Sequence, residues 1–184
     1  MTQAEDRYST VAIALHWLIA LLILINIFVG GAMEDASGPA RRGIFIWHQS
    51  LGISVLALTL LRLGWRVGHK APALPAHMAA WEKALAHGVH VAFYVLLLAI
   101  PLLGWAAVSA GRNGVAPLFD AIPFFNLPIP KSREAHDVFG EAHEAAVKGM
   151  YVLVALHVIG ALKHKFVDRD SVLGRMLPFL RRAG

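Results

Sequence analysis

HEAAVKGMYVLVALH, residues 143–157, is a largely apolar segment with a histidine at each end. Fourteen helical residues rise about 21 Å and turn through nearly four full circles, so the two imidazoles should share one helix face near opposite surfaces of a bilayer. Ionisable side chains are costly inside a membrane, and histidines within a membrane-spanning segment are therefore functional candidates. The competing interpretation is that both rings simply pack against neighbouring helices.

The composition of the whole chain favours a membrane protein. Of its 184 residues 57% are hydrophobic and only 16% are charged, and the mean hydropathy is +0.57. The absence of cysteine excludes thiolate zinc sites, iron–sulfur clusters, covalently attached haem and disulfides, so any transition metal must depend on the ten histidines. The net charge of +5 does not indicate a nucleic-acid partner, because most basic residues flank apolar segments.

Four apolar segments are long enough to cross a bilayer and predict an all-α, integral membrane four-helix bundle, with residues 1–184 as a single domain. The first could instead be a cleaved signal peptide, but its apolar run is long, its start is weakly basic, and it contains His16. The spans are expected at about residues 11–32, 43–67, 84–108 and 140–166.

Basic residues beside the spans predict the orientation of the bundle. They are more numerous around the amino terminus, the second connection and the tail, so we expect both termini in the cytoplasm. That side has Arg7, Arg62, Arg66, Lys70, Lys83, Lys163, Lys165, Arg169, Arg175, Arg181 and Arg182, and the other side has Arg41, Arg42, Arg112, Lys131 and Arg133.

Depth within the spans pairs four of the histidines. His16 and His157 lie at similar distances from the cytoplasmic ends of their spans, and His48 and His143 both lie near the outer ends. Two imidazoles that approach one iron from opposite sides hold a six-coordinate b-type haem suited to electron transfer. The pattern therefore predicts two b-type haems, one above the other, about 20 Å apart.

Four motifs in the spans carry a family resemblance. They are HWLIALLIL in the first, HQSLGISVLALTLLRLGWRV in the second, LAHGVHVAFYVLLLAIPLLG in the third, and HEAAVKGMYVLVALH followed by RMLP in the fourth and the tail. With these motifs the chain resembles the prokaryotic cytochrome b561 family over all four spans. The resemblance implies a dihaem protein of the bacterial inner membrane, with His16 and His157 as axial iron ligands of one haem and His48 and His143 of the other.

The same resemblance implies an activity. The family includes enzymes that pass electrons from superoxide to ubiquinone, and it is similar to the cytochrome b subunits that link hydrogenases and formate dehydrogenases to quinone. We therefore expect a superoxide:ubiquinone oxidoreductase. The alternative is an electron-carrying subunit that docks onto a partner oxidoreductase. A histidine-lined metal transporter ranks last, because the spans have few carboxylates beyond Glu141 and Glu144.

Three further histidines are candidates for a ubiquinone site near the inner haem. His87 and His90 begin the third span, and His164 lies seven residues beyond His157, which on a continuous α-helix is nearly the same face. Histidine can give a quinone carbonyl both a hydrogen bond and a proton. Alternatively, these are interfacial histidines with polar tips among lipid headgroups, or His90 replaces one of the four haem ligands.

Charged residues suggest two further contacts. Arg62 and Arg66 could pair with haem propionates or serve only as membrane anchors. Superoxide is a small anion, so its approach should be basic and close to the outer haem; the candidates are Arg41, Arg42, Lys131 and Arg133. Acidic residues in the same region leave this assignment open.

Overall fold

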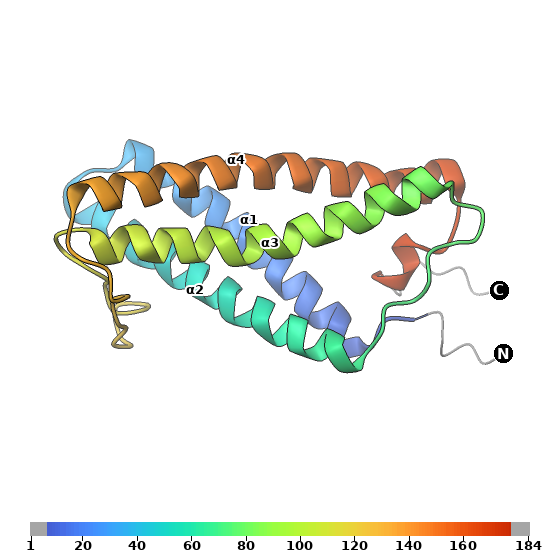
Figure 1. Ribbon diagram of the computed structural model, residues 1–184, viewed down its shortest axis with the longest axis horizontal. Helices are drawn as coiled ribbons and strands as arrows, with labels where there is room; N and C mark the ends of the chain where they lie inside the picture. Colours follow the sequence, from blue (N-terminus) through green and yellow to red (C-terminus); the bar gives the residue numbers. More distant parts are fainter. Residues whose placement is uncertain (1–6, 178–184) are drawn as a thin grey trace.

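A computed structural model describes residues 7–177 and shows four long helices lying together as a bundle (Figure 1). The predicted all-α, four-helix membrane architecture is confirmed: each helix is long and apolar enough to cross a bilayer, and the described residues form no strand beyond an isolated Leu118–Ile122 bridge. The first three expected spans each lie within one α-helix, and the fourth begins inside its α-helix and runs three residues past its end into the helical turn that follows. The helices are α1 (Thr10–Asp35), α2 (Gly38–Gly68), α3 (Ala80–Ala110) and α4 (Arg133–Lys163).

The two ends of the bundle differ (Figure 1). At one end, which we call the terminal end, lie residues 7–9, the α2–α3 connection and residues 164–177. At the other, which we call the loop end, lie the short α1–α2 connection and the long segment 111–132. Large apolar side chains such as Phe28 and Ile159 are exposed along the helices between these ends, as expected for surfaces that face lipid.

Neighbouring helices pack in chain order, α1 on α2, α2 on α3 and α3 on α4, whereas close backbone approach between α1 and α4 is rare or absent. One apolar residue from each helix forms the core at mid-height. In α4 this residue is Met150, halfway between His143 and His157. The core therefore separates the two histidine levels. Its members are Ile19, Val55, Leu97 and Met150.

The end of α4 differs from the simple expectation of a span running to residue 166. The α-helix ends at Lys163, and the chain continues as one π-helical turn, η2 (His164–Asp168). Arg169 then adopts a left-handed conformation with φ of 55°, and its backbone N–H is bonded to the His164 carbonyl. The backbone N–H of His164 still bonds to the Gly160 carbonyl, so the chain departs from α-helical geometry only after His164.

The segment 111–132 is fastened to the helices by buried serines. The Ser50 hydroxyl is fully buried, donates to the Ile46 carbonyl at 2.6 Å and accepts from the Phe119 backbone N–H at 2.7 Å. The Ser109 hydroxyl, also fully buried, accepts from the Leu127 N–H at 3.0 Å. These bonds hold the segment as a cover over the loop end of α2 and α3.

Candidate haem sites and their surroundings

The structure brings His16 and His157 together at the terminal end of the bundle. His16 lies on α1 and His157 on α4, and their ring centroids are 6.1 Å apart. Both rings are half-buried. This pair bridges the side of the bundle on which α1 and α4 are not closely packed.

His48 and His143 form a second pair toward the loop end. His48 lies on α2 and His143 on α4, and their ring centroids are again 6.1 Å apart. Two imidazoles bonded to one metal ion from opposite sides, each through a bond of about 2 Å, have centroids roughly 6 Å apart. Both pairs therefore have the spacing that a shared iron requires, and α4 supplies one ring to each.

Hydrogen bonding fixes the ring of His143. Its Nδ1 lies 2.8 Å from the Ile100 carbonyl of α3, and because a carbonyl only accepts, Nδ1 carries the proton. Nε2 is then the nitrogen with a free lone pair for a metal, and the bond holds the ring in one orientation. His48 differs, since its buried Nδ1 has no hydrogen-bond partner.

Two glycines make room for the second pair. A Cβ at Gly104 would lie 3.1 Å from Nδ1 of His143, and a Cβ at Gly30 would lie 3.2 Å from Cε1 of His48. Either contact is tighter than normal side-chain packing allows without movement. The spacing of both imidazole pairs fits a bis-histidine haem at each level, and the two glycines give room to the rings of the second pair. Sequence reasoning missed both glycines, because no pattern along one helix shows which neighbour a residue meets.

Basic and aromatic groups surround the first pair at the terminal end. Arg62 donates from Nη1 to the Ala12 carbonyl at 2.6 Å, which places its guanidinium beside α1 one turn before His16. Arg62 and Arg66 line a small cavity of about 20 Å³. Its remaining walls are Tyr8, Ala12, Trp65, His69 and Tyr94. The two arginines therefore line the same small cavity.

The three remaining histidine candidates are divided between two places. The ring of His90 lies 5.7 Å from that of His157, and its Nδ1 donates to the Ala86 carbonyl at 2.6 Å. His87 is exposed one turn earlier on α3. His164 instead joins Asp168 and Asp170, and in the described part of the chain no hydrogen bond or ring contact links it to His87 or His90.

The candidates for an anion approach all lie exposed at the loop end. Arg41 donates to the Met33 carbonyl and Lys131 to the Gly111 carbonyl, both at 2.8 Å. Arg133 forms an exposed pair with Asp137 at 3.7 Å, and Arg42 extends from the first turns of α2. Carbonyl contacts hold Arg41 and Lys131 in place without neutralising their charge.

Comparison with known proteins gives a consistent picture. The model of the family described as prokaryotic cytochrome b561 matches residues 7–179. The chain is 28% identical to a probable superoxide oxidase CybB of Yersinia pestis, with 95% of this chain and 97% of that protein aligned. It is 29% identical to cytochrome b561 homolog 1 of Escherichia coli strain K12 (94% and 98% aligned) and to cytochrome b562 of Cereibacter sphaeroides (96% and 98%).

Proposed function

This chain belongs to the prokaryotic cytochrome b561 family of membrane electron-transfer proteins, and we propose that it carries electrons from superoxide to ubiquinone through two b-type haems. The observation that supports this most directly is the pair of equal 6.1 Å separations between imidazoles, one on each side of the apolar core. A relative named as a probable superoxide oxidase supports the choice of donor.

The residues proposed to hold the haems are His16 with His157 and His48 with His143. When bound by two imidazoles, haem supplies reversible one-electron transfer and offers no open position to oxygen. The protein's part is to hold the rings: the Ile100 carbonyl orients His143, and Gly30 and Gly104 leave space around the second pair. Arg62 and Arg66 are proposed to bind propionates of the first haem.

The loop end is proposed to face outward and the terminal end the cytoplasm of a bacterial inner membrane. The larger number of basic residues at the terminal end supports this orientation. Superoxide would then approach Arg41, Arg42, Lys131 and Arg133, whose charges raise the local concentration of a small anion.

Ubiquinone is proposed to bind at the terminal end, where His90 lies beside His157. His87 and His164 are further candidates at this end. His90 and His164 both donate from Nδ1 to oxygen atoms. Such a ring can also donate from Nε2 only when it is protonated, and a quinone carbonyl would then receive the hydrogen bond and a proton from one group.

The test uses the purified, haem-loaded protein in proteoliposomes with ubiquinone and an enzymatic source of superoxide. We expect ubiquinone reduction that requires haem, stops when superoxide dismutase is added, and is lost in His157→Ala. A rate no faster than that of the haem-free protein would exclude superoxide as the donor. Copurification with a larger catalytic subunit, together with such a negative result, would favour the electron-carrying subunit.

A further inference from the structure

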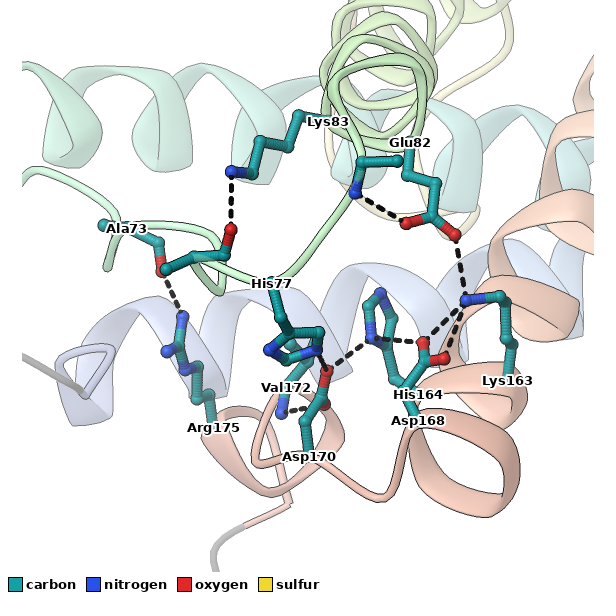
Figure 2. Close-up of polar contacts among 12 residues, drawn as sticks. Ala73, His77, Glu82, Lys83, Lys163, His164, Asp168, Asp170, Val172 and Arg175 are labelled. Atoms are coloured by element: carbon teal, nitrogen blue, oxygen red, sulfur yellow. Dashed lines mark hydrogen bonds and ion pairs between the residues drawn. The ribbon is translucent and has the colours of Figure 1, made fainter.

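Imidazoles and carboxylates gather at a second place, where the α2–α3 connection meets the end of α4 (Figure 2). We call this group the terminal-end cluster; it consists of His77, His164, Asp168 and Asp170. Nδ1 of His164 lies 2.8 Å from Oδ2 of Asp170 and 3.3 Å from Oδ2 of Asp168. Nε2 of His77 approaches the same Asp170 oxygen at 3.5 Å.

The spacing of these atoms matches that of donors around one small metal ion. The donor atoms of His164, Asp168 and Asp170 all lie within 4.8 Å of one another. In a tetrahedral zinc site with bonds of about 2.0–2.2 Å, neighbouring donors are roughly 3.3–3.6 Å apart. The His164–Asp168 separation is already 3.3 Å, so only small movements would place these three donors around one ion, and the 3.5 Å approach of His77 to Asp170 puts a second imidazole beside them.

The cluster is sheltered and supported by neighbouring groups. The side chains of Asp170 and His164 are only 10% and 13% exposed, whereas His77 is 59% exposed and gives access from solvent. Oδ1 of Asp170 accepts from the Val172 N–H at 2.9 Å, which fixes the carboxylate. Lys163 contacts both oxygens of Asp168, at 2.7 and 2.9 Å, and steadies it from the far side.

Among the groups that form ion pairs in the cluster, negative charge exceeds positive charge when both histidines are neutral. Glu82, Asp168 and Asp170 carry three negative charges, and Lys163 bonds to two of these carboxylates. The ion pairs of Asp170 in the described residues are with His77 and His164, which are cationic only when protonated. A sheltered carboxylate needs a counter-charge, and a divalent cation supplies it without protonating either ring.

We propose that the terminal-end cluster binds one divalent transition-metal ion of the zinc type. His164, Asp168 and Asp170 serve as ligands, and His77 completes the set from the α2–α3 connection. Mixed imidazole and carboxylate donors suit zinc better than calcium or magnesium, which prefer oxygen alone. Binding through Nδ1 requires the proton of the neutral His164 ring to move to Nε2, and the bound ion ties the α2–α3 connection to η2. It leaves Nε2 of His164 unused, so the inference does not depend on the haem or ubiquinone proposals.

The experiment is a calorimetric titration of the chelator-treated, haem-loaded protein with zinc chloride, compared among four proteins. We expect one zinc ion per wild-type chain and an affinity at least about tenfold weaker in Asp170→Asn and His164→Gln. Asp120→Asn is the matched control, since it makes the same change at an exposed carboxylate of the loop end and should bind like the wild type.

Two further measurements separate loss of the site from loss of the fold. An unchanged visible haem spectrum shows that a variant is intact, and zinc X-ray absorption should show only nitrogen and oxygen neighbours, including imidazole. The proposal is overturned if intact wild-type protein shows no saturable zinc binding, or if Asp170→Asn and His164→Gln bind zinc as tightly as wild type. Saturable binding of calcium but not zinc would also overturn it.

Discussion

At the scale of single residues, the proposed ligands make a prediction about haem content. His157 and His48 belong to different pairs, so His157→Ala and His48→Ala should each lose one haem and keep the other. The haem-to-protein ratio of each purified variant should fall to about half of the wild-type value, because one axial ligand of a buried bis-histidine site is missing. Loss of a haem in His90→Ala, with both haems retained in His16→Ala, would contradict the pairing.

Neighbouring glycines of α1 test the packing around His48. Gly30→Ala places a Cβ 3.2 Å from the ring, whereas a Cβ at Gly31 meets nothing within 4 Å. We expect Gly30→Ala to turn the ring and change the electron paramagnetic resonance signal of one ferric haem, at a cost of about 1–3 kcal/mol in stability. Gly31→Ala makes the same change in helix propensity as Gly30→Ala and should leave the signal unchanged. Identical spectra from both variants would show that His48 is not confined by Gly30.

Sequence alone predicted which histidines approach one another but not what holds them. The spacing of His143 and His157 on one helix fixes their levels, and depth in the other spans then selects the partners. The Ile100 carbonyl and the cradle at Gly104 depend on how α3 is rotated against α4, which no single helix encodes. Such contacts arise only in the packed bundle.

At the scale of elements, the contacts just beyond the end of α4 could not be predicted from helical periodicity. His164 still follows α4, with its backbone N–H bonded to the Gly160 carbonyl, but the π turn of η2 takes the residues after it away from α-helical positions. Asp168 and Asp170 flank the left-handed Arg169 and so meet His164, a contact with no counterpart in helical periodicity. The sequence predicted no role for these two aspartates.

The cover at the loop end gives a prediction for Ser50. Ser50→Ala removes the acceptor of the Phe119 N–H, and leaving a buried donor unpaired costs about 1–3 kcal/mol. We expect faster hydrogen exchange at Phe119 and its neighbours in the segment 111–132. Ser54→Ala is the control, because the Ser54 hydroxyl bonds only to the Ser50 carbonyl of its own helix. Equal exchange in both variants would mean that Ser50 does not hold the cover.

At the scale of the whole molecule, the lengths of the apolar segments were sufficient to predict the number of helices and their approximate positions. It could not predict their ends: α4 begins at Arg133, seven residues before the expected span, because the Ser132 hydroxyl caps it by accepting from the Ala135 N–H. Nor could it show that α1 and α4 lack close packing. That feature depends on how all four helices are arranged.

The end of the bundle that superoxide approaches can be tested with two lysines. Lys131 bonds through Nζ to a backbone carbonyl at the loop end, and Lys83 does the same at the terminal end. If superoxide approaches the loop end, Lys131→Gln should slow superoxide-driven ubiquinone reduction roughly two- to threefold at low salt, because one attracting charge is lost. Lys83→Gln should leave the rate unchanged.

The salt dependence of the ubiquinone reduction rate distinguishes the loss of electrostatic attraction for superoxide from damage to the fold. The difference between Lys131→Gln and wild type should shrink as the Debye length falls from about 30 Å at 0.01 M salt to about 3 Å at 1 M, since screening removes the benefit of the charge. A deficit that persists at high salt would point to a structural effect of losing the bond to Gly111. A slower rate in Lys83→Gln alone would place the superoxide approach at the terminal end and would contradict the proposed approach at the loop end.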